Sequence, residues 1–163
     1  MNSVDTLTTL FVHNRWANLR LLDACIELTE EQLDGVVIGA YGSIRDTLQH
    51  VSTAERSYFS RISTGQPYRR PQDAPPLTLQ EMYESLRASG DGLIEWATRV
   101  QVGDTFQVDW DGAPRQVPMT ILLAQAINHA TEHRAQVMVI LTQLGVQPPD
   151  LDGWTYFDSL EPW

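Results

Sequence analysis

The chain has 163 residues, of which 42% are hydrophobic, and its formal net charge at pH 7 is −10. This length allows one domain with a substantial core, and we predict a single domain over residues 1–163. The negative charge and the lack of any basic cluster argue against a nucleic-acid partner, and the absence of lysine excludes Schiff-base chemistry on a lysine.

The first predicted helix covers residues 4–28, where hydrophobic residues recur with helical spacing. Two polar residues, Asn14 and Asn18, fall within this hydrophobic stripe. They could orient a metal-binding imidazole through its free N–H, or they could bond to the helix backbone or to each other. The sequence leaves both interpretations open.

The second predicted helix covers residues 43–63. Ser43 and Asp46 are typical of an N-cap and a first-turn acid. Gly65 and Pro67 are expected to end the helix.

A proline-rich loop, TGQPYRRPQDAPPL, follows the second helix and is too long for a tight helical hairpin. We expect it to cross an end of the molecule, so the helices that it joins need not be antiparallel neighbours. Thr78 and Glu81 predict a capping box for a third helix at about 79–100. Gly90 lies on the hydrophobic face of that helix, where another helix could approach closely.

Residues 105–118, TFQVDWDGAPRQVP, are predicted to form a small β-hairpin. Hydrophobic and polar residues alternate from Phe106 to Trp110, and Asp111-Gly112 is a favoured two-residue turn.

The fourth predicted helix covers residues 118–144, beginning at Pro118 and ending before Gly145. The tail, residues 150–163, contains four aromatic side chains and is expected to pack over the helices. Four long helices in a chain of this size predict an all-α four-helix bundle.

The segment NHATEHRAQ, residues 128–136, carries two histidines one helical turn apart. His133 falls within the hydrophobic face of the fourth helix and His129 at its margin. Two imidazoles at this spacing can bind one metal ion, although stacked histidines also occur at groove edges without a metal. Glu132 projects to solvent, and its position differs from that in the HExxH motif of zinc proteases.

His50, on the second helix, is a candidate third ligand because facing helices of a bundle often share an internal site. Three neutral imidazoles without cysteine suit a divalent ion such as zinc or nickel, and they leave a coordination position open. The alternative is that His50 lies on the helix surface. The fourth histidine, His13, is predicted to be a surface residue.

Two charged residues, Glu55 and Arg134, project into hydrophobic helix faces. Buried charges are costly unless paired, so we hypothesise that they pair with each other or with Asn14 and Asn18. The alternative is that both side chains extend to solvent at the rim of the bundle.

Three segments, WANLRLL at 16–22, SIRDTLQHVSTAE at 43–55 and NHATEHRAQ at 128–136, resemble the DinB-like family of bacterial helical-bundle proteins. The resemblance extends over nearly the whole chain. It implies an up-down-down-up bundle, often a homodimer, with one divalent metal ion on a triad that corresponds here to His50, His129 and His133.

Characterised members of that family include thiol S-transferases that use mycothiol or bacillithiol, and a mycothiol-dependent isomerase. The resemblance therefore implies a metal-dependent enzyme that transfers a low-molecular-weight thiol to a small-molecule substrate. A metal-dependent hydrolase and a non-catalytic metal-binding stress-response protein are the alternatives. No side-chain general base is evident in the sequence.

We expect a cytoplasmic location and no membrane partner. The only cysteine, Cys25, excludes an internal disulfide and fits a reducing compartment. The N-terminal residues lack the features of a signal peptide, and no hydrophobic run is long enough to cross a bilayer.

Overall fold

The computed structural model describes residues 5–160, which form helices and one small antiparallel sheet. In chain order the elements are α1 (Thr6–Cys25), α2 (Glu30–Leu33), α3 (Ile44–Thr64), α4 (Leu79–Ala97), β1 (Thr105–Trp110), β2 (Ala113–Pro118), α5 (Met119–Gln143) and α6 (Gly153–Leu160).

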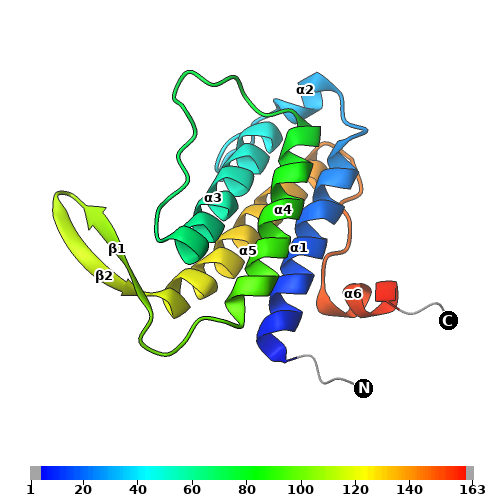
Figure 1. Cartoon of the computed structure of the whole chain (residues 1–163). Coiled ribbons are helices and arrows are strands. Elements are labelled where there is room, and N and C mark those ends of the chain that lie inside the picture. Colours follow the sequence, from blue (N-terminus) through cyan, green and yellow to red (C-terminus); the bar gives the residue numbers. More distant parts are fainter. Residues whose placement is uncertain (1–4, 161–163) are drawn as a thin grey trace.

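Helices α1, α3, α4 and α5 form a four-helix bundle with up-down-down-up topology (Figure 1). Helix α1 runs up from the N-terminus, α3 and α4 both run down, and α5 returns upward. The loop between α3 and α4 spans the length of the bundle, so these two helices are parallel neighbours. The structure thus confirms the predicted all-α bundle and the prediction that these two helices need not be antiparallel neighbours. The loop was predicted to cross an end of the molecule, whereas it runs along the side of the bundle from one end to the other (Figure 1).

Local capping sets the helix ends. Ser43 and Asp46 form a reciprocal capping box at the start of α3, and Thr78 and Glu81 form another at the start of α4. Gly65 ends α3 with φ of 75°, in the left-handed region that favours glycine.

The first helix is shorter than predicted. It ends at Cys25 because Thr29 caps a separate short helix, α2, which the sequence analysis did not predict. The predicted start at Val4 lies outside the described residues.

The β-hairpin forms in the predicted register, with Thr105 opposite Pro118 and Trp110 opposite Ala113. Asp111 and Gly112 make the turn, and both have positive φ, as a two-residue turn of this kind requires.

The core consists of two groups of buried side chains, one towards the α2 end of the bundle and one towards the hairpin end. Phe106 and Val108 on β1 belong to the second group, so the hairpin is packed against the bundle at its base. A Cβ atom at Gly90 would lie 2.5 Å from Cγ of Arg15, which confirms that α1 approaches α4 closely there.

The C-terminal segment packs against α1, as predicted for the described part of the tail; residues 161–163 lie outside the described range. Nε2 of His13 lies 2.9 Å from the carbonyl oxygen of Leu151, and the rings of His13 and Trp16 both contact Tyr156. The prediction that His13 is a surface residue was therefore wrong. Its half-buried ring holds the tail against the bundle, away from the other three histidines.

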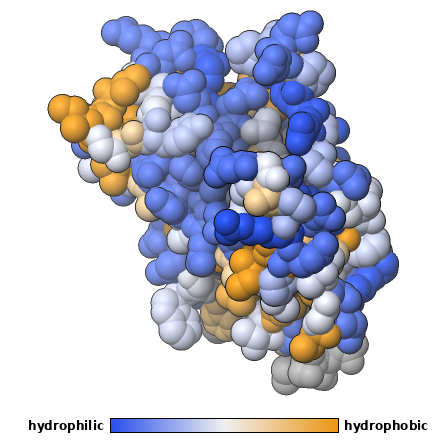
Figure 2. Space-filling view, turned by 90° about the vertical axis from the view of Figure 1, so that its left-hand side faces the viewer, coloured by the Kyte–Doolittle hydropathy of each residue, from blue (hydrophilic) through white to orange (hydrophobic). Residues whose placement is uncertain are grey.

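Hydrophilic side chains cover most of the face on which α3 and the hairpin lie, and hydrophobic side chains interrupt it in patches (Figure 2). Among the described residues, no helix combines the length and the apolar character that a membrane span requires.

Candidate metal centre

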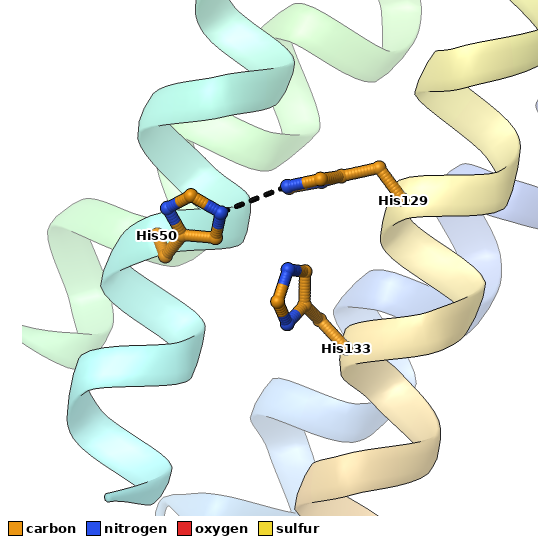
Figure 3. A group of neighbouring side chains, drawn as sticks. All are labelled: His50, His129 and His133. Atoms are coloured by element: carbon orange, nitrogen blue, oxygen red, sulfur yellow. Dashed lines mark hydrogen bonds between the residues drawn. The ribbon is translucent and has the colours of Figure 1, made fainter. Parts of the chain in front are cut away.

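Three histidines from two antiparallel helices meet between α3 and α5 (Figure 3). His50 comes from α3, and His129 and His133 come from successive turns of α5, so the helical spacing places the last two one above the other. His133 is buried, with 8% of its surface exposed, and the other two are half-buried. The structure thus brings all three predicted ligand residues together. The alternative, in which His50 is an isolated residue on the helix surface, was wrong.

Their nitrogen atoms are close enough to share one ion. Nε2 of His50 lies 2.8 Å from Nε2 of His129, and one nitrogen from each of the three rings falls within a 4.8 Å span. Imidazole nitrogens lie about 2.0–2.1 Å from a bound zinc ion, so two of them are at most about 4.2 Å apart. Small side-chain movements would therefore suffice to place all three around one cation.

Two neighbouring side chains orient the imidazoles. The side-chain oxygen of Gln136 only accepts hydrogen bonds, and it lies 2.9 Å from Nδ1 of His133. Nδ1 of His133 therefore carries the proton, and Nε2 keeps its lone pair for a metal. Tyr41 stacks on His50, with ring centroids 4.4 Å apart, and its hydroxyl lies 3.2 Å from Nδ1 of that ring.

The surroundings of the triad favour the neutral form of two of its imidazoles, His50 and His129. Burial, together with the neighbouring His133 and His50, lowers the pKa of His129 to about 4. Burial and His133 also lower the pKa of His50 below its ordinary value of 6.5. Because a metal ion binds only the neutral imidazole, these lowered pKa values reduce the competition of protons with a metal ion for the ring nitrogens.

The donor set fits a divalent ion of intermediate hardness. Three neutral nitrogen donors without a thiolate or carboxylate suit zinc or nickel. Among the described residues, no fourth histidine, cysteine, aspartate or glutamate joins the group. Such a set leaves at least one coordination position for water or a substrate, as in catalytic zinc sites.

Comparison with known proteins places the chain in a family. The model of the DinB family matches residues 1–162. The chain belongs to the DinB family. The fold is similar to the crystal structure of a DinB-like protein from Bacillus cereus, with a TM-score of 0.61 and 21% sequence identity over 85% of this chain and 91% of that one. No curated protein matches the sequence.

Beside the triad, this DinB protein buries two charged residues that are joined through asparagines. Glu55 accepts hydrogen bonds from the side chains of Asn14, Asn18 and Ser89 at 2.8–3.1 Å. Arg134 donates to the side-chain oxygens of the same two asparagines at 2.8 and 2.6 Å.

This arrangement decides two questions that the sequence left open. The charged residues do pair across the bundle, through Asn14 and Asn18, and they do not extend to solvent. The asparagines serve this network and do not bond to the imidazoles of the triad. Burial raises the pKa of Glu55 to about 7, against the opposing effect of its three hydrogen bonds and of Arg134.

Sequence reasoning missed the partners of the imidazoles. Gln136 lies three residues after His133, the spacing at which helical side chains meet, but glutamine on a helix carries no pattern of its own that marks it as a partner of an imidazole. Tyr41 lies in the loop before α3, and no local pattern indicates that its ring turns back onto His50. Tyr58 contacts the ring of His129, with centroids 5.7 Å apart.

We expect Gln136→Ala to weaken metal binding by about 10- to 100-fold, because loss of a hydrogen bond to a ligand imidazole has effects of this size. Competition with a chromophoric zinc chelator would measure the affinity. Gln143→Ala, an exposed glutamine on the same helix, is the matched control and should bind metal as the wild type does. Equal affinities for wild type and Gln136→Ala would show that the hydrogen bond does not orient His133.

Proposed function

We propose that this DinB protein binds one divalent ion, zinc or nickel, at His50, His129 and His133, and that it transfers a low-molecular-weight thiol to a small-molecule acceptor. The observation that supports this proposal most strongly is the convergence of three imidazoles with no fourth protein ligand among the described residues. His50 also lines an open groove of about 430 Å³, which gives a cosubstrate access to the triad.

A divalent ion held there would lower the pKa of a coordinated thiol and so supply a thiolate near neutral pH. In the transfer, the sulfur forms a bond to an electrophilic carbon of the acceptor. The leaving group departs with its bonding electron pair, and the thiol proton passes to solvent. Because coordination removes that proton, the reaction does not require a side-chain general base at the triad.

The thiol has to come from a cosubstrate. Cys25 is the only cysteine of the chain, and it is buried in the core. Burial raises the pKa of its thiol to about 12, so Cys25 does not act as a nucleophile near neutral pH.

Cobalt substitution tests the proposal. The Co(II) protein would be titrated with 2-mercaptoethanol and with glutathione, and conjugation of each thiol to monochlorobimane would be followed separately. We expect a sulfur-to-cobalt charge-transfer band and metal-dependent conjugation. A Co(II) spectrum that neither thiol changes would contradict the transferase and favour a structural role for the metal. Thiol binding without conjugation to monochlorobimane would support the metal site and its open position but would contradict the proposed transfer.

The number of protons released on metal binding should be smaller than for three free histidines. A free histidine has a pKa of about 6.5, whereas in the folded protein the pKa of His129 is about 4 and that of His50 is also lowered. At about pH 5.5, zinc binding should therefore displace clearly fewer than three protons. Calorimetry in buffers of different ionisation enthalpy counts these protons, and a value close to three would contradict the lowered pKa values of His50 and His129.

A further inference from the structure

A second groove begins beside the triad and runs towards the β-hairpin. Its volume is about 400 Å³, and its walls come from α3, the hairpin and the first turns of α5. Most of its lining is apolar or aromatic: Tyr58, Phe106, Val108, Trp110, Val117, Ile121 and Leu122. A concave apolar site with few polar groups is typical of a small-molecule site.

One end of this groove adjoins the candidate metal centre. Tyr58 lines the groove and contacts the ring of His129 edge-on. Gln125 lines it as well, and it precedes His129 by about one turn of α5. A ligand in the groove would therefore have one end near the imidazoles.

At the end of α3 the groove has a cation, Arg61, in the last turn of the helix and about one turn beyond Tyr58. Its guanidinium lies over the ring of Phe106, 5.5 Å from the centroid, and no carboxylate among the described residues lies within ion-pair distance of it. Arg61 also lines an adjoining polar groove of about 690 Å³, together with Arg69 and Asp109. Within the part of the chain that the structure describes, neither arginine forms a salt bridge, although the net charge of the protein is −10.

The electrostatics favour an anion at this end. Partial burial and the charge of Arg69 lower the pKa of Arg61, so the positive charge is held there at a cost that a bound anion would offset. A guanidinium binds a carboxylate with two parallel hydrogen bonds, which gives direction as well as affinity. Among the described residues that line the adjoining groove, Asp109 is the only carboxylate, and it forms no ion pair with Arg61 or Arg69.

We propose that this groove binds the acceptor substrate and that the acceptor is a small organic acid with an apolar body. Its carboxylate bonds to Arg61, its body lies against Phe106 and Trp110, and its reactive end lies near the triad. His50 and Arg61 are separated along α3 by about 16.5 Å at 1.5 Å per residue, which gives the scale of the distance between the triad and the carboxylate end of the ligand. This inference rests on the proposed function for the reaction, but the binding itself does not require the metal.

The test uses metal-free full-length protein and two probes of the same shape, 4-phenylbutyrate and the uncharged 4-phenylbutan-1-ol. We expect the acid to bind at least tenfold more tightly than the alcohol, and both to shift the indole N–H signal of Trp110 in NMR spectra. Arg61→Gln should remove the preference for the acid and leave binding of the alcohol unchanged. Arg87→Gln, which changes an exposed arginine on α4, is the matched control and should keep the preference.

Equal binding of the two probes to the wild type, or equal loss of acid binding in Arg61→Gln and Arg87→Gln, would overturn the proposal. If Arg61→Gln does not fold, as judged by circular dichroism, Arg61→Lys serves instead; it keeps the charge but loses the paired hydrogen bonds, so acid binding should fall by a smaller factor. If the metal-free protein prefers the acid but the spectrum of the cobalt form does not change with either thiol, only the proposed transferase activity is contradicted. If the cobalt form binds thiols but the protein does not prefer the acid over the alcohol, only the proposed role of the groove is contradicted.

Discussion

Replacing His133 with alanine is expected to abolish stoichiometric binding of a divalent ion. Of the three imidazoles, this one is the most buried, and its Nε2 is left free by the hydrogen bond from Nδ1 to Gln136. Without it, His50 and His129 alone would bind an ion much as two exposed histidines on a surface do. Because loss of a partner that only orients a ligand already costs 10- to 100-fold in affinity, we expect loss of the ligand itself to cost at least about 100-fold.

Elemental analysis of purified protein after zinc reconstitution and gel filtration measures this effect. The wild type should hold close to one ion per chain and His133→Ala close to none, with unchanged helix content by circular dichroism. His13→Ala is the matched control, since His13 lies against the C-terminal segment and not in the triad. Unchanged zinc content in His133→Ala, or equal losses in both variants, would show that the ion binds elsewhere.

Replacing Arg134 with methionine is expected to lower the free energy of unfolding by about 3–5 kcal/mol, because removing one partner leaves an uncompensated buried charge. Both charged residues are buried, with Glu55 2% exposed and Arg134 6% exposed. The substitution would also remove the hydrogen bonds that the guanidinium donates to the side-chain oxygens of Asn14 and Asn18. Urea denaturation measures the change, and Arg87→Met, at an exposed position, should have an effect close to zero.

A double-mutant cycle separates the network from simple loss of packing. In a Glu55→Gln background the negative charge is absent, so Arg134→Met should be less destabilising than in the wild type, by at least about 1 kcal/mol. The pKa of Glu55 is already raised to about 7, and loss of Arg134 should raise it further, so Glu55 takes up a proton more readily in the variant. The destabilisation should therefore be smaller at pH 5 than at pH 8. A pH-independent loss with no coupling would contradict a charge-based role.

Much of the fold follows from local patterns that act over a few residues. Capping boxes at Ser43 and Thr78 determine where α3 and α4 begin, and Asp111-Gly112 determines the turn of the hairpin. The length of the loop before Thr78 indicated that α3 and α4 need not be antiparallel. This prediction concerned how two helices are arranged relative to each other, whereas the others concerned single elements. The short helix α2 was missed because only four residues form it, too few for a periodic pattern.

The sequence predicts the relative positions of site residues most directly when they lie on the same helix, because helical spacing then fixes which side chains are neighbours. His129 and His133 share a helix face by their separation alone, whereas the approach of His50 depends on how α3 packs against α5. The bundle architecture made His50 a candidate ligand, and the family resemblance supported it. The stacking of Tyr41 on His50 depends on the path of a loop. Asn14 and Asn18 were recognised as unusual polar residues in a hydrophobic face, but their partners lie on other helices, so the sequence could not distinguish the imidazoles from Glu55 and Arg134.

X-ray absorption at the zinc edge of the reconstituted protein tests most directly whether the three histidines hold one ion with a position left open. We predict scattering from three imidazoles, with nitrogen at about 2.0–2.1 Å, and one further light atom that is replaced by sulfur at about 2.3 Å when 2-mercaptoethanol is added. A spectrum without imidazole scattering, or a fourth protein ligand that the thiol does not displace, would contradict the proposed centre.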